Sequence, residues 1–65
     1  MKIDMAAKRK EHKLTQTELG ERVGIAQRTV AAYESGERRP SIEVAQRLAK
    51  ELDVMWTDFY DESEG

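Results

Sequence analysis

The feature that most restricts the fold is a set of helix start and stop signals packed into residues 15–36. The first is the segment TQTE at residues 15–18, a capping box. In it the Thr15 hydroxyl accepts from the Glu18 backbone N–H, and the Glu18 carboxylate accepts from the Thr15 N–H. Gly24 can end this helix in the left-handed conformation, and Gly36 can end a second helix in the same way. The sequence therefore predicts two short helices separated by the segment GIA at residues 24–26.

Two short helices joined by a glycine-containing turn are typical of a helix-turn-helix, whose helices cross steeply and touch at few points. Gly20 is expected at the closest approach of the two helices, where a larger side chain would clash. The apolar residues expected to hold the crossing together are Leu19, Val23, Ile25, Val30 and Tyr33. An ordinary corner between two helices of a small bundle is the alternative interpretation of this segment.

The remaining segments predict an all-α domain. Residues 2–13 contain neither glycine nor proline and are expected to form a helix. Ser41 is a natural N-cap for a helix over residues 42–52, and residues 56–60 are expected to form a last short helix. The inward side of the helix over 42–52 is predicted to consist of Ile42, Ala45, Leu48, Ala49 and Leu52. Residues 1–60 then make up one domain, and residues 61–65 an acidic tail that is expected to be disordered.

The composition excludes several classes of protein. The 65 residues include no cysteine and one histidine, which rules out disulfides, cysteine-ligated zinc and a histidine metal cage. No apolar run approaches the ~20 residues that a membrane span needs, and no signal peptide precedes the domain, so a cytoplasmic protein is expected. No serine has a histidine base at a plausible spacing. We therefore expect no enzyme activity, cofactor, metal, small-molecule ligand or membrane partner.

The net charge of −2 hides an asymmetry along the chain. Residues 1–40 hold nine Lys and Arg against six Asp and Glu, whereas residues 41–65 hold two against seven. Such a separation favours one face that meets an anionic partner and another that is kept away from it. A domain this small also buries little surface, so oligomerisation is an expected source of stability.

The segment LTQTELGERVGIAQRTVAAYESGERRPS, followed by VAQRLAKELDV, resembles the phage repressor/Cro (XRE-type) helix-turn-helix family. The likeness runs from about Arg9 to Phe59. It implies a compact five-helix, lambda repressor-like DNA-binding domain of a bacterial or phage regulator associated with the nucleoid. It also implies a homodimer on a roughly palindromic double-stranded DNA operator, with the second helix of the motif in the major groove.

The resemblance also suggests which side chains would touch DNA. The base-reading positions would be Gln27, Arg28, Thr29 and Ala32. The phosphate-contacting positions would be Gln16, Lys13, Arg38 and Arg39. Glutamine can bond bidentately to adenine, arginine can do so to guanine, and alanine can offer only its methyl to thymine. Without the motif, a solvated helix face would be the preferred interpretation of Gln27 and Arg28.

Two further features follow from the family pattern. Arg9 and Glu34 correspond to a partly buried ion pair, which is interpreted as structural. Lys13 and Asp53 stand where glycines are common, and Ala26 lacks the hydroxyl that would cap the second helix of the motif.

The aromatic residues near the C-terminus have two possible roles. Met55, Trp56, Phe59 and Tyr60 either close the core or contribute part of a dimer interface. The function indicated first is a transcriptional regulator, most often a repressor, that a protein anti-repressor could control. The alternative is an antitoxin-like or adaptor module that uses this fold to cap a protein partner such as a toxin.

Overall fold

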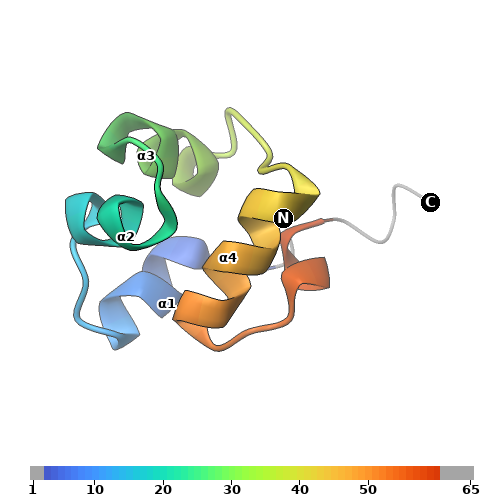
Figure 1. Cartoon of the computed structure of the whole chain (residues 1–65), viewed down its shortest axis with the longest axis horizontal. Coiled ribbons are helices and arrows are strands. Elements are labelled where there is room, and N and C mark those ends of the chain that lie inside the picture. The colour runs from blue at the N-terminus through green and yellow to red at the C-terminus, as the bar shows by residue number, and fades with distance from the viewer. Residues whose placement is uncertain (1–2, 61–65) are drawn as a thin grey trace.

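The computed structural model describes residues 3–60, in which every regular element is helical. The elements, shown in Figure 1, are α1 (Met5–Glu11), α2 (Gln16–Val23), α3 (Gln27–Ser35), α4 (Ile42–Leu52) and the 3₁₀ helix η1 (Trp56–Phe59). The predicted all-α fold is confirmed. The fifth helix is a four-residue 3₁₀ helix that ends at residue 59 rather than 60. The tail predicted for residues 61–65 lies outside the described residues.

Helix α1 is shorter than the predicted helix over 2–13. Asp4 is its N-cap, and the Asp4 carboxylate accepts from the Ala7 backbone N–H at 3.1 Å, so the helix begins at Met5. The helix ends at Glu11, and Lys13 then takes a left-handed conformation with φ of 58°. A run without glycine or proline does not show these ends, because side-chain capping and backbone strain decide them.

Helices α2 and α3 have the predicted starts and stops. Thr15 Oγ1 accepts from the Glu18 N–H at 3.0 Å, and Glu18 Oε1 accepts from the Thr15 N–H at 2.8 Å. Gly24 and Gly36 end the two helices with φ of 81° and 86°. Ala26 makes no side-chain capping bond at the start of α3, as its missing hydroxyl predicts.

The close approach at Gly20 involves the turn of the motif. A Cβ built on Gly20 would lie 2.5 Å from the carbonyl oxygen of Ile25, which is a backbone atom that cannot swing away. The Ile25 and Gly24 backbone N–H groups both donate to the Gly20 carbonyl, at 2.9 and 2.8 Å. A residue without a side chain therefore lets the turn fold back tightly against α2.

One hydrophobic core joins all five elements. Its buried members are Met5, Leu19, Val23, Val30, Tyr33, Ala45, Leu48, Ala49, Leu52 and Phe59. The prediction that Ile42 faces inward is wrong, because its side chain is 57% exposed. Ile42 is the first residue of α4, and at that end the apolar stripe of the helix runs beyond the edge of the core. None of the helices among residues 3–60 is both long and apolar enough to cross a membrane.

Candidate nucleic-acid interface

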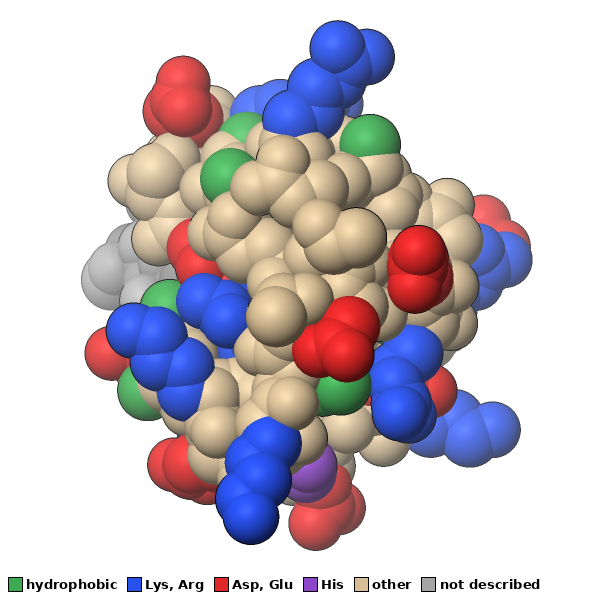
Figure 2. All heavy atoms as spheres, turned by 90° about the vertical axis from the view of Figure 1, so that its left-hand side faces the viewer, with side chains coloured by type: hydrophobic (Ala, Val, Ile, Leu, Met, Phe, Trp, Pro, Cys, Tyr) green, Lys and Arg blue, Asp and Glu red, His purple; other side chains and the backbone are tan. Residues whose placement is uncertain are grey.

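The motif formed by α2 and α3 lies on the left-hand side of the molecule in Figure 1. Gln27 and Arg28 are exposed on the first turn of α3, whereas Thr29 and Ala32 are partly buried. Figure 2 views the molecule from this side. It shows a central area of backbone and uncharged side chains, with Lys and Arg around it and Asp and Glu among them. This face therefore combines an uncharged central area with cationic and acidic side chains around it.

The residues predicted to contact phosphate occupy three separate places. Gln16 is the first residue of α2 and is partly buried. Lys13 is exposed in the loop between α1 and α2. Arg38 and Arg39 are exposed in the loop after α3, where they line a hollow of about 250 Å³ together with Gly36 and Glu37. With two arginines against one glutamate, the lining of this hollow carries a net positive charge, which suits an anionic group of a partner.

A hydrogen-bonded network runs from α1 to the first residue of α3. The Arg9 Nε donates to Glu34 Oε2 at 2.7 Å, and its Nη2 donates to Glu34 Oε1 at 3.3 Å. The Arg9 Nη1 also donates to the Leu14 carbonyl at 2.8 Å. Gln16 Nε2 donates to Glu34 Oε1 at 3.0 Å, and Gln27 Nε2 donates to Gln16 Oε1. The side chains of Arg9 and Glu34 are only 11% and 9% exposed, so this ion pair is nearly buried.

The contact between Gln16 and Glu34 could not be found from the sequence. The two residues are eighteen positions apart and lie on different helices. The family resemblance pointed to Gln16 as a phosphate contact and to Glu34 as the partner of Arg9, but no pattern in the sequence joins Gln16 to Glu34. Their meeting depends on how α2 crosses α3.

Comparison with known proteins matches residues 5–59 to a family model described as helix-turn-helix. The chain belongs to the helix-turn-helix family. This match covers every element from α1 to η1. The resemblance to repressor/Cro-type proteins is therefore confirmed at the level of the helix-turn-helix family.

Two relatives of this helix-turn-helix domain carry similar names. One is an uncharacterized HTH-type transcriptional regulator of Methanothermobacter thermautotrophicus, 50% identical over 44 residues, or 68% of this chain. The match spans 64% of that relative, a little under two thirds of its length. Another is an uncharacterized HTH-type transcriptional regulator of Methanocaldococcus jannaschii, 33% identical over 60 residues, or 92% of this chain and 91% of the relative. No solved structure shows a significant match.

The C-terminal aromatic cluster of the helix-turn-helix domain is divided between core and surface. Phe59 is fully buried, so it has no surface to offer to a second copy, and its assignment to a dimer interface is corrected. Trp56 and Tyr60 are partly buried and meet edge to face, with ring centroids 6.1 Å apart. Met55 is 65% exposed, which leaves it available for contact with another molecule.

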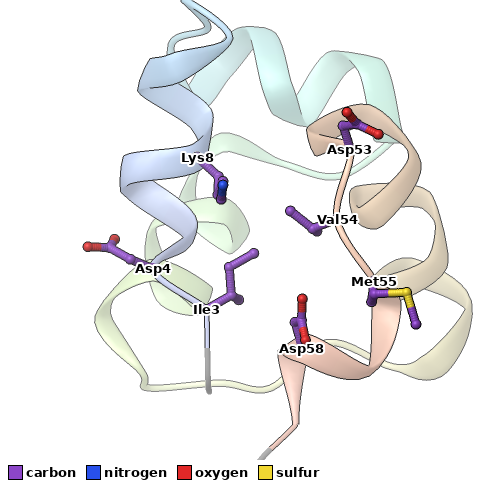
Figure 3. A pocket seen from close by; sticks show the side chains of 7 residues that line it. All are labelled: Ile3, Asp4, Lys8, Asp53, Val54, Met55 and Asp58. Carbon is purple, nitrogen blue, oxygen red and sulfur yellow. The ribbon is translucent and has the colours of Figure 1, made fainter.

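Met55 borders a hollow of about 480 Å³ between the start of α1 and the segment that joins α4 to η1 (Figure 3). The hollow is lined by Ile3, Asp4, Lys8, Asp53, Val54, Met55 and Asp58. Its walls combine apolar side chains with three carboxylates and one amine. In Figure 1, η1 lies on the opposite side of the molecule from α2 and α3. A molecule that bound in this hollow would therefore leave the motif uncovered.

Tyr60 connects the end of η1 to the loop before α4. Its hydroxyl donates to the Pro40 carbonyl at 2.8 Å. Burial raises the pKa of the Tyr60 hydroxyl above 10.0; the nearby Arg39 lowers this pKa and Tyr33 raises it, both by smaller amounts. The protonated hydroxyl is therefore the form that the folded domain favours.

Proposed function

We propose that this chain is a sequence-specific double-stranded DNA-binding transcriptional regulator. The observation that carries the proposal is the exposure of Gln27 and Arg28 on the first turn of α3, directly beside the start of α2. A helix-turn-helix reads DNA with the N-terminal part of its second helix, which lies in the major groove. Family membership and the printed names of the two relatives support DNA binding and regulation rather than enzyme activity.

The side chains on this face divide into two kinds of contact. Gln27 and Arg28 carry the donor and acceptor groups that distinguish adenine and guanine in the major groove. Thr29, which follows Arg28, would add a contact to a base edge or a phosphate, and Ala32, one turn further along α3, would offer its methyl to a thymine methyl. Phosphate contacts would come from Gln16, Lys13, Arg38 and Arg39, and these would position α3 without specifying the sequence.

The regulator would act as a homodimer that represses transcription. Two copies related by a two-fold axis would place their α3 helices in half-sites about one helical turn, ~34 Å, apart on a palindromic operator. The surface that supports pairing includes exposed Met55, partly buried Trp56 and Tyr60, and the adjacent hollow. Occupancy of the operator would exclude polymerase, and a protein anti-repressor could relieve it.

The proposal is tested by selecting bound sequences from random DNA duplexes and then measuring the affinity of the protein for the most enriched sequence. Arg28→Ala should lose about 1–3 kcal/mol of binding free energy and relax the preference at one base pair in each half-site. Lys50→Ala is the matched control, because Lys50 is exposed on α4 and its loss removes the same charge elsewhere. This control should keep both the affinity and the base preference.

Two results would overturn the assignment. If no sequence is enriched even at low salt, where phosphate contacts are strongest, the chain does not read DNA. A stable complex with a purified protein partner in the same preparation would then favour the antitoxin-like or adaptor function. If Arg28→Ala weakens binding equally for all sequences, Arg28 contacts phosphate and the base-reading assignment is wrong.

A further inference from the structure

We propose that Tyr60 is a positioning residue that holds Arg39 where its guanidinium can contact a DNA phosphate. This inference rests on the proposed DNA-binding function and concerns the loop between α3 and α4, residues 36–41. Tyr60 lies directly after η1, and its hydroxyl donates to the Pro40 carbonyl at 2.8 Å. Because this donor is already engaged, Tyr60 acts through the backbone of the loop and not by a contact of its own with DNA.

The loop has backbone support from α3 only in its first half. The N–H groups of Glu37 and Arg38 both donate to the Ala32 carbonyl, at 3.0 and 3.3 Å. Within the described part of the chain, the Arg39 N–H has no hydrogen-bond partner, and Pro40 has no N–H to donate. The position of Arg39 therefore depends on what holds the residue that follows it.

Tyr60 supplies the support that the second half of the loop needs. Pro40 is fully buried, so its carbonyl needs a donor from within the protein, and the Tyr60 hydroxyl is that donor. The Tyr60 ring is itself held in place, because it meets the ring of Trp56 edge to face, with centroids 6.1 Å apart. The Tyr60 N–H also donates to the Thr57 carbonyl at 3.1 Å. The end of α3 and the end of η1 therefore fix different halves of the loop.

The Arg39 guanidinium lies near the Tyr60 hydroxyl. Burial raises the pKa of this hydroxyl, and the positive charge of Arg39 lowers the pKa by a smaller amount, which requires the two groups to be close. Arg39 is nevertheless exposed, and it lines the hollow of about 250 Å³ together with Arg38. If the hydroxyl were removed, the Pro40 carbonyl would lose its partner, and the loop would shift to let this carbonyl reach water. Such a shift would carry the Arg39 guanidinium away from its place beside Arg38.

The test measures DNA affinity at several salt concentrations, at a temperature where circular dichroism shows each variant folded. Two duplexes are used, the sequence that the wild type selects and an unrelated sequence. Tyr60→Phe should weaken binding to both duplexes about tenfold, as the loss of a hydrogen bond to a charged group does. The slope of log affinity against log salt should fall by about 1 for each protomer, because a phosphate contact is lost. The base preference should stay unchanged.

Tyr33→Phe is the matched control, because it removes the same oxygen from the other tyrosine of the chain. Among residues 3–60 the Tyr33 hydroxyl has no hydrogen-bond partner, whereas the Tyr60 hydroxyl has one. The control should therefore keep both the affinity and the salt slope of the wild type.

A double-mutant cycle separates positioning from effects on stability or self-association. In an Arg39→Ala background, Tyr60→Phe should weaken binding by less than about twofold, because the contact that it positions is already absent. Arg39→Ala alone should reproduce the losses of affinity and slope, which tests the inference even if Tyr60→Phe does not fold. Equal losses from Tyr60→Phe in both backgrounds, wild-type affinity in Arg39→Ala, or a loss confined to the selected sequence would refute the role of Tyr60. Failure of the wild type to select any sequence would instead refute the proposed function.

Discussion

At the scale of single residues, backbone conformation matters more than side-chain chemistry at several positions. Lys13 and Asp53 adopt positive φ of 58° and 59°, although glycine would do so with less strain. Gly20 is different, because it lies inside α2 and does not have a positive φ. Glycine is required there because the fold leaves no room for a side chain. The carbonyl oxygen of Ile25 occupies the place that a Cβ would need.

Gly20→Ala is therefore predicted to destabilise the domain. A helix interior normally gains up to about 1 kcal/mol from this change, but the backbone clash should reverse the sign and cost about 1–3 kcal/mol. Thr17→Ala is the control, because Thr17 is exposed on the same helix and should gain a few tenths of a kcal/mol. Urea unfolding of both variants measures the difference. Equal or greater stability of Gly20→Ala would show that the turn can move away from α2.

At the scale of elements, long-range polar contacts help to hold the helices in place, and two examples involve partly buried side chains. The ion pair of Arg9 and Glu34 joins α1 to α3, and Tyr60 joins η1 to the loop before α4 through Pro40. Exposed pairs within one helix, such as Glu43 with Arg47, lie in high dielectric and contribute little. The contacts that matter for stability are therefore those that leave a buried group unpaired when one partner is removed.

Glu34→Ala should cost on the order of 3 kcal/mol, because Arg9 would remain desolvated without its partner. For a domain of this size, 1 kcal/mol corresponds to roughly 4–8 °C in melting temperature, so a thermal melt resolves the loss easily. Glu43→Ala removes a carboxylate from the exposed pair and should cost less than about 1 kcal/mol. A melt of Glu34→Ala within a degree or two of wild type would contradict the structural role.

Tyr60 should make the stability depend on alkaline pH. Burial raises the pKa of its hydroxyl in the folded state above 10.0, so the folded domain binds this proton more tightly than the unfolded chain. The contribution of the protonated Tyr60 hydroxyl to the free energy of unfolding is therefore fully present below pH 10, and it is lost as the pH rises through the folded-state pKa. Tyr60→Phe should be less stable by about 1 kcal/mol at neutral pH, since the bond to Pro40 is lost. Unfolding free energies of both proteins should converge above pH 10, and parallel curves would contradict this assignment.

At the scale of the whole molecule, the two parts of the chain differ in net charge, and the hollow beside Met55 lies away from the motif. The N-terminal part of the sequence, which contains α2 and α3, is basic overall, whereas the part from residue 41 is acidic. Met55 and its hollow lie near η1, on the far side from the motif. A dimer that forms there would leave both α3 helices free to meet DNA.

Met55→Asp is predicted to weaken self-association without unfolding the monomer. The new carboxylate would stand beside Asp53 and Asp58 and would repel the equivalent group of a second copy. Ile42→Asp is the matched control, because Ile42 is comparably exposed at the other end of α4. Sedimentation at several concentrations should show a loss of dimer for Met55→Asp alone. A dimer that survives Met55→Asp and dissociates with Ile42→Asp would move the interface to the start of α4.

The sequence by itself determined the elements that local chemistry controls. The capping box at Thr15, the left-handed glycines and the spacing between them identify α2, the turn and α3, since each signal acts within a few residues. The same local signals place Gln27 and Arg28 at the start of α3. Family resemblance added the pairing of Arg9 with Glu34.

Only the tertiary structure decided how these elements use their side chains. It exposed Ile42, buried Phe59, and shortened α1 to a helix that begins after Asp4. It also brought Gln16 between Glu34 and Gln27, which no sequence spacing indicated. Burial and long-range hydrogen bonds depend on how helices cross, and the crossing is set by packing among residues far apart in the chain.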